Sequence, residues 1–308
     1  MVERCGDVNR RISPRAYEKL CLASYISLFV IVISGGLVRL TGSGLGCSDW
    51  PQCNSERFID VSSVHGAIEQ INRLFTGVVA ALVIAAVLGS LFLAERKRSL
   101  TQLSLGLVVG VLAQVILGAI VVLTGLNPFA NMGHFLLSML LIANAIVLYR
   151  KSRVAQNTVF DGSPQERKYL LTIGVLFGCA VISGTVVTAT GPHAGDENAV
   201  RFGFSITSVA RVHSFFVLLS LLVLLVVLLK VRKSPQTREF LEQRLAAFLG
   251  VGLLQALVGY VQYFNGIPVI LVATHLFGAA LIWSLAVDTI TVSGSALSLP
   301  KSQSSSHR

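Results

Sequence analysis

Three histidines lie inside long apolar segments of this chain. His134, His213 and His275 each lie one or two helical turns from one end of such a segment. Ionisable side chains are rare in lipid-spanning segments, so we interpret all three as functional. Imidazole binds haem iron well, and helical bundles hold cofactors between facing helices. The alternative interpretation is a neutral histidine that is hydrogen-bonded across helices.

An internal repeat relates these histidines. A shift of 141 residues places His134 on His275, and the same shift places Asn72 on His213. This agreement across several segments predicts a tandem duplication, with one half at 1–150 and the other at 151–308. Further pairs are Gln114 with Gln255, Gly118 with Gly259, Gly125 with Gly266 and, at a shift of 149, Ile33-Ser34-Gly35 with Ile182-Ser183-Gly184.

The two halves differ at one candidate ligand. His213 and His275 could bind one iron in the second half as a permanent site. In the first half the corresponding residues are Asn72 and His134. Asparagine is a poor ligand for haem iron, so the first half is expected to leave a coordination position open. An open position suits an exchangeable substrate or oxygen chemistry.

A cluster of polar residues precedes Asn72. His65, Glu69 and Asn72 have i, i+4, i+7 spacing and therefore share one face of a helix. Glu69 is the catalytic candidate, because a carboxylate at the membrane edge can move protons or stabilise developing charge. It could instead be an interfacial residue paired with Arg73. His65 could replace the missing iron ligand, although it lies about two turns nearer water.

Two cysteines flank the peptide 48–52 in the first connection expected outside the membrane. Cys47 and Cys53 are predicted to form a disulfide, because that compartment is oxidising. The pair is either a structural crosslink or a redox-active or covalently engaged pair. Zinc is disfavoured, since it needs three or four protein ligands. The other thiols, which look like single cytosolic or buried cysteines, are Cys5, Cys21 and Cys179.

Other polar residues on the outer side have weaker predicted roles. The cations could bind haem propionates, but ordinary interfacial placement is the simpler interpretation. These cations are Arg39, Arg57, Arg201 and Arg211. His193 and Asp196 are expected to shape the surface of a later outer loop.

Composition places these residues in a membrane protein. The chain has 308 residues, of which 53% are hydrophobic and 13% charged, whereas soluble domains carry about 25% charged residues. The net charge of +10 comes from basic residues at the edges of apolar blocks. That placement sets membrane orientation and argues against nucleic-acid binding.

We therefore predict an all-α polytopic membrane protein, with eight transmembrane helices arranged as two tandem four-helix bundles. The first segment is too long for the core of a signal peptide, so we interpret it as a retained span. Basic connections and the basic N-terminus fall on one side, which predicts a multi-pass protein with both termini in the cytoplasm. The spans are expected near 20–38, 71–93, 102–124, 130–149, 169–189, 209–230, 245–264 and 267–288.

The chain resembles the haem A synthase family over nearly its whole length. The most specific motif is GGLVRLTGSGLGCSDWPQC at 35–53, and TGPHAGD follows at 190–196. Ile68-Glu69, Asn72-Arg73 and the order of His134, His213 and His275 add to the resemblance.

The resemblance implies a cell-membrane enzyme that oxidises the C8 methyl of haem O to the formyl group of haem A, for terminal oxidase assembly. It implies haem b as cofactor, bound by His213 and His275. It also implies haem O in the first half, with Glu69 as the catalytic carboxylate and His134 as an iron ligand. The Cys47–Cys53 pair resembles the type with a loop disulfide. Implied partners are haem O synthase and an electron donor, and a homo-oligomer is compatible.

One position departs from the family pattern. The best-known members have histidine where this chain has Asn72, which leaves the iron ligation of the first half open and with it the role of His65. The alternative function is a di-haem b electron-transfer cytochrome, which would need two closed sites. A transporter is the third class, but it should show broken helices or charges at mid-membrane.

Overall fold

The computed structural model describes residues 11–153 and 163–292. Within these ranges the chain forms eight long helices and one isolated bridge, between Ile12 and Leu93. Every helix is long and apolar enough to cross a bilayer. The predicted all-α, multi-pass fold is confirmed. The helices are α1 (Pro14–Leu40), α2 (Val64–Leu91), α3 (Arg98–Leu123), α4 (Pro128–Ser152), α5 (Pro164–Thr190), α6 (Ile206–Val231), α7 (Pro235–Phe264) and α8 (Val269–Val292).

Several helices begin before the apolar segments that predict them. Helix α2 begins at Val64 rather than near residue 71, because the side chain of Ser63 accepts a hydrogen bond from the amide of Gly66. Helix α5 begins at Pro164, where Ser163 and Glu166 form a reciprocal capping box. The early start of α2 matters for function, since it places His65 and Glu69 on the helix.

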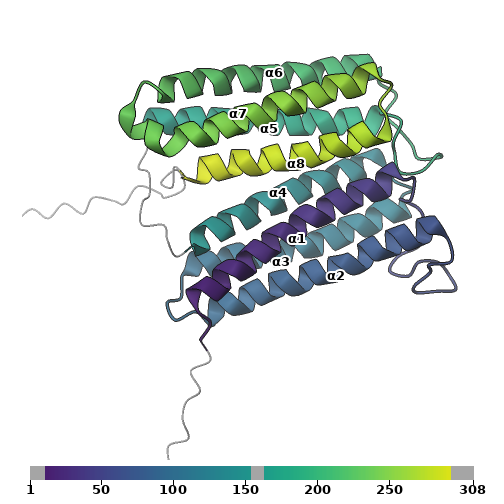
Figure 1. Ribbon diagram of the computed structural model, residues 1–308. Coiled ribbons are helices and arrows are strands. Elements are labelled where there is room, and N and C mark those ends of the chain that lie inside the picture. Colours follow the sequence, from purple (N-terminus) through teal and green to yellow (C-terminus); the bar gives the residue numbers. More distant parts are fainter. Residues whose placement is uncertain (1–10, 154–162, 293–308) are drawn as a thin grey trace, which may run out of the picture. The chain divides into compact units, whose positions relative to one another are not determined.

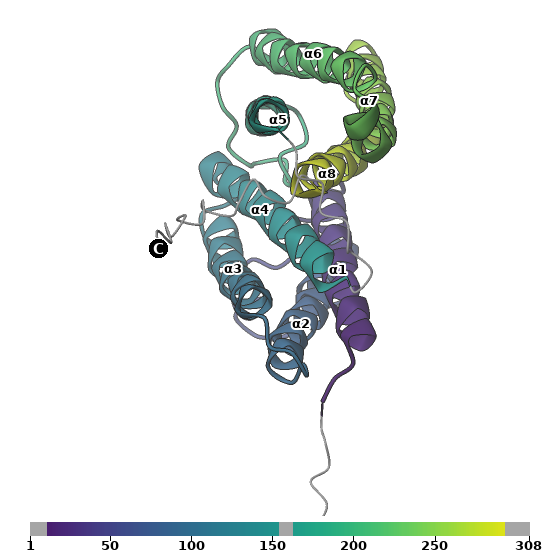
Figure 2. The same cartoon turned by 90° about the vertical axis from the view of Figure 1, so that its left-hand side faces the viewer.

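The chain divides into two compact units, each of which is described by itself. Unit 1 contains α1–α4 together with His193–Arg201 from the α5–α6 loop, and unit 2 contains α5–α8. In unit 1, α1 and α3 each pack against both α2 and α4 (Figure 1). In unit 2, α5 and α7 each pack against both α6 and α8 (Figure 2). Each unit is thus a closed ring of four helices.

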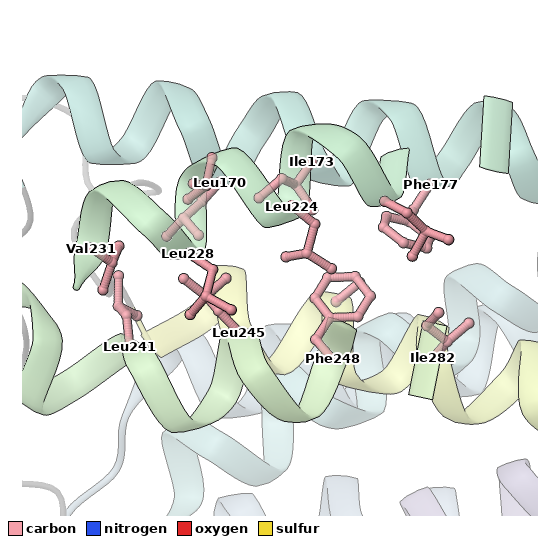
Figure 3. Close-up of a cluster of buried hydrophobic side chains, with 13 residues drawn as sticks. Leu170, Ile173, Phe177, Leu224, Leu228, Val231, Leu241, Leu245, Phe248 and Ile282 are labelled. Carbon is pink, nitrogen blue, oxygen red and sulfur yellow. The ribbon is translucent and has the colours of Figure 1, made fainter. Parts of the chain in front are cut away.

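Each unit has an apolar core in the half where its first helix begins. In unit 2, Leu224, Leu245 and Phe248 are fully buried, and the rings of Phe177 and Phe248 lie 4.6 Å apart (Figure 3). In unit 1 the corresponding core includes Tyr17 and Leu107. The candidate histidines lie on the other half of their helices, beyond these cores.

The turns that join the last two helices of each unit have the same geometry. Gly125 and Leu126 have φ of 62° and 63°, and Gly266 and Ile267 have 77° and 60°. The amide of Leu126 donates to the carbonyl of Val121, and the amide of Ile267 donates to that of Gln262. These pairs are related by the shift of 141 residues. The two turns therefore share the same backbone geometry and the same hydrogen bond at positions that the sequence repeat pairs.

Candidate functional site

The last histidine of each unit is placed by the preceding helix in the same way. Gln114 Nε2 donates to the carbonyl oxygen of His134 over 3.0 Å. Gln255 Nε2 donates to that of His275 over 2.7 Å. In both units the glutamine comes from the third helix and the histidine from the fourth. The backbone of each candidate ligand is thereby fixed against its neighbour.

Glycines make room for these imidazole rings. A Cβ added at Gly259 would lie 3.0 Å from Cε1 of His275, and one at Gly118 would lie 3.5 Å from Cε1 of His134. Both histidines are half-buried, and within the described residues their Nδ1 atoms are buried without a hydrogen-bond partner. A buried ring nitrogen without a hydrogen-bond partner costs free energy in a membrane bundle. It indicates either that another group binds the ring at its other nitrogen or that a ligand supplies the missing contact.

In unit 2 two imidazoles from different helices face each other. The ring centroids of His213 on α6 and His275 on α8 lie 6.4 Å apart, with the ring planes at 78°. Two imidazoles that each bind one metal through a bond of about 2 Å place their centroids roughly 6 Å apart. The separation therefore fits one metal ion held between the two rings.

Helix α5 orients the ring of His213. Its Nδ1 lies 3.0 Å from the carbonyl oxygen of Ala180 and 3.2 Å from Oγ of Ser183. A carbonyl oxygen only accepts, so Nδ1 carries the proton and Nε2 retains its lone pair. A hydrogen bond of this kind fixes the tautomer of a metal-binding histidine. The residues present thus fit a haem iron with two histidine ligands.

In unit 1 the equivalent position on α2 is Asn72. Its Oδ1 accepts a hydrogen bond of 2.7 Å from Oγ of Ser34 on α1. Ser34 corresponds to Ser183 in the repeat, so the same serine position contacts both side chains. The unit 1 site therefore keeps the supporting residue of the unit 2 site but presents an amide in place of an imidazole.

Glu69 is buried and joins helix α2 to the first outer loop. Its Oε2 accepts from the amide of Cys47 over 2.8 Å, and its Oε1 accepts from Arg73 Nη2 over 2.5 Å. Arg73 Nη1 in turn donates to the carbonyl oxygens of Asp49 and Gln52, at 3.1 Å and 3.3 Å. The pairing with Arg73 that we considered from sequence is present. Glu69 and Arg73 together hold the loop at Cys47 and at Gln52, near the two ends of the segment 47–53.

That segment is closed by the predicted Cys47–Cys53 disulfide, which is confirmed. Both cysteines are buried. Gly46 lets the loop approach α2, because an added Cβ would overlap the carbonyl of His65 and lie 2.8 Å from the amide of Gly66. The crosslink thus belongs to a loop packed closely on the helix that carries Glu69. Beyond it, hydrogen bonds from Ser62 lower the pKa of the half-buried Asp60 carboxyl.

His65 lies away from the position of Asn72. Its Nδ1 is 2.9 Å from Oγ of Ser43, a fully buried residue at the start of the loop, and the histidine itself is exposed. In this structure the ring of His65 contacts the α1–α2 loop through Ser43.

The outer cations have separate surroundings. The exposed side chain of Arg57 lies 3.7 Å from the half-buried carboxylate of Asp60, and Arg211 is exposed on α6. Arg39 lies against Gly195, whose carbonyl oxygen accepts from the amide of Gly44. The segment that contains His193 and Asp196 therefore packs on unit 1, which the sequence alone did not indicate.

Ser34 and Ser183 contact the repeat-related residues Asn72 and His213, and sequence reasoning assigned neither serine a role. Both appeared only as matched letters of the repeat. A signal was available, because each lies one residue before a glycine that is also paired in the repeat. A serine in such a place, on a helix next to a candidate ligand, is the residue expected to hold that ligand.

Comparisons with known proteins agree with these features. The COX15-CtaA family model, described as cytochrome oxidase assembly protein, matches residues 18–65 and 56–287. A protein named heme A synthase from Listeria monocytogenes serovar 1/2a is 30% identical over 171 residues, which cover 53% of this chain and 55% of the relative. One from Bacillus pumilus is 37% identical over 134 residues, covering 42% and 43%. The chain thus spans about half the length of the relatives it matches.

Arg73 can be tested through stability. Arg73→Leu leaves the buried carboxylate of Glu69 without its ionic partner and is expected to destabilise the folded protein by about 2 kcal/mol. Thermal unfolding of the full chain in detergent measures this. Arg57→Leu is the matched control, since Arg57 is exposed and lies 3.7 Å from its carboxylate partner, and an ion pair with an exposed member costs under about 1 kcal/mol to remove. Equal losses of stability in Arg73→Leu and Arg57→Leu would contradict the conclusion that the Glu69–Arg73 pair holds the loop.

Gly46 can be tested through loop mobility. The added Cβ of Gly46→Ala has backbone atoms in its way, so the loop must move off α2. Hydrogen exchange of the amides in 47–53 is expected to speed up at least about tenfold, the change that follows from losing one buried hydrogen bond. Gly77→Ala serves as control, because nothing lies within 4 Å of its added Cβ. Unchanged exchange in Gly46→Ala would show that the contact is unimportant.

Proposed function

We propose that this chain, which belongs to the COX15-CtaA family of cytochrome oxidase assembly proteins, is a haem A synthase. Its substrate is haem O, whose C8 methyl group is oxidised to a formyl group. The observation that carries the proposal is the pair of facing imidazoles in unit 2 together with an unequal, repeat-related position in unit 1. The names of the similar proteins from Listeria and Bacillus support the same activity.

The two units have different tasks in this proposal. Unit 2 holds haem b through His213 and His275 as a permanent cofactor, which supplies electron transfer. Unit 1 takes haem O, with His134 as an iron ligand. Two closed sites, which an electron-carrier cytochrome would need, fit the two units less well, because Asn72 cannot replace a histidine as ligand.

Glu69 is the catalytic carboxylate in this proposal. It is held on α2 by Arg73 and by the amide of Cys47, so its position is fixed at the end of unit 1 where the outer loop packs. A fixed carboxylate can accept a proton released from the methyl carbon or stabilise positive charge that develops beside it. Two successive hydroxylations of the methyl carbon, each consuming one dioxygen, two electrons from the donor and two protons, would give the hydrated aldehyde and two waters. The hydrated aldehyde then loses a further water to leave the formyl group.

The membrane orientation and the partner proteins belong to the same proposal. Basic residues at the α2–α3, α4–α5 and α6–α7 connections support a cell-membrane protein with both termini in the cytoplasm. Glu69 and the disulfide loop then lie near the outer surface. Haem O synthase would supply the substrate, and a separate donor would supply electrons to unit 2.

The activity is tested by extracting haems from cells that make haem O, with and without this protein. Haem A is expected on chromatography only when the chain is present. Glu69→Gln is expected to lower its amount at least about a hundredfold, the usual contribution of a general acid or base. Glu56→Gln, an exposed loop carboxylate, should leave it unchanged. Haem b alone in cells that hold folded protein would instead favour the electron carrier.

The cofactor site is tested by haem content. His213→Ala and His275→Ala should each abolish the spectrum of the haem with two histidine ligands, since each removes one ligand. His193→Ala, a histidine of the outer loop, is the control and should retain it. A full absorption spectrum in the double variant would refute the assignment of these two ligands.

A further inference from the structure

The side chain of Asn72 is held in the same way as the iron-ligand candidate of the other unit. Ser34 contacts Asn72 Oδ1 at 2.7 Å, and Ser183 contacts His213 Nδ1 at 3.2 Å. The neighbouring glycine is repeated as well. A Cβ at Gly35 would lie 3.9 Å from Asn72 Nδ2, and one at Gly184 would lie 3.1 Å from Cε1 of His213.

The chemistry of the amide differs from that of imidazole. Oδ1 is engaged by the serine, so the atom left toward the site is Nδ2. An amide nitrogen has no lone pair for a metal and is a donor only. Within residues 11–153 and 163–292, Nδ2 has no hydrogen-bond acceptor. A half-buried donor without an acceptor, at the position that corresponds to a candidate metal ligand in the other unit, is suited to a ligand's lone pair.

The side chain of Asn72 is also shorter than that of histidine. An imidazole at this position would extend further, so the amide nitrogen ends short of the atom that would bind an iron. His65 does not take the place of the missing imidazole here, because its Nδ1 is bonded to Ser43 and it lies about two turns nearer the N-terminal end of α2.

We propose that unit 1 binds haem iron through His134 on one face only, and that Asn72 Nδ2 donates a hydrogen bond to a small exchangeable ligand on the open face. Asn72 is thus a positioning residue for that ligand, which is an anion or a diatomic molecule with a lone pair directed at the amide. The inference rests on one part of the proposed function, namely haem binding by unit 1, and is independent of whether the methyl group is oxidised.

The experiment is a cyanide titration of the full chain, purified in detergent with its haems oxidised. One haem, in unit 1, is expected to bind cyanide, and the haem held by His213 and His275 is not. Asn72→His should close the open face and abolish cyanide binding, giving the spectrum of two haems with two histidine ligands each. Asn72→Leu should keep the face open but weaken cyanide binding about tenfold, through loss of one hydrogen bond.

Two further variants serve as controls. Asn144→Leu removes an amide in the same unit, one that donates to the carbonyl of Leu103, and should leave cyanide affinity unchanged. Ser34→Ala should weaken cyanide binding by less than Asn72→Leu, because it frees the amide to rotate. These readouts also report folding, since each variant must retain the spectrum of the unit 2 haem.

Three results would overturn the proposal. They are no cyanide binding by the unaltered protein, equal affinity in Asn72→Leu, and cyanide binding that appears only in His65→Ala, which would make His65 the second iron ligand. The proposed function fails separately. A protein that binds cyanide as described but yields no haem A would keep the role of Asn72 and lose the enzymatic activity.

Discussion

A hydrogen bond between the first and second helix of each unit fixes which atom of the repeat-related side chain stays unbonded. In unit 2 the carbonyl of Ala180 and the hydroxyl of Ser183 leave His213 with a lone pair on Nε2. In unit 1 the equivalent hydroxyl of Ser34 leaves Asn72 with a donor. Because lipid offers no competing hydrogen bonds, such a contact persists and fixes the side chain. A duplicated bundle thereby acquires two chemically different sites through a change at one position.

The outer loop is tied to this arrangement through charge. Glu69 and Arg73 lie on the same helix as Asn72, and between them they hold the amide of Cys47 and the carbonyls of Asp49 and Gln52. A buried ion pair is not by itself a large source of stability, since both groups lose water. Here its contribution is geometric, because one carboxylate both closes the loop onto the bundle and remains at the site where chemistry is proposed.

Much of the architecture could be predicted from the sequence. Apolar segments gave all eight helices, and the shift of 141 residues predicted turns whose φ values agree to within about 15°. Helix starts were missed where a polar cap extends the helix beyond the apolar run, as at Ser63. The contact between Ser43 and His65 could not be predicted from the sequence. A serine hydroxyl can bond many partners, and a separation of 22 residues across a loop follows no helical or strand periodicity. The same holds for the packing of 193–201 on unit 1, which depends on loop shape.

That last segment has a consequence for how the two halves can be separated. Gly195 accepts from the amide of Gly44, and Ala194 and Ala199 pack with Val121 and Leu126, so a stretch encoded in the second half completes the outer end of the first. A gene fragment that stops after α4 would therefore make a bundle with an unmet backbone donor and an uncovered apolar end. The first four helices therefore depend, for the closure of one end, on residues that follow α5 in the chain.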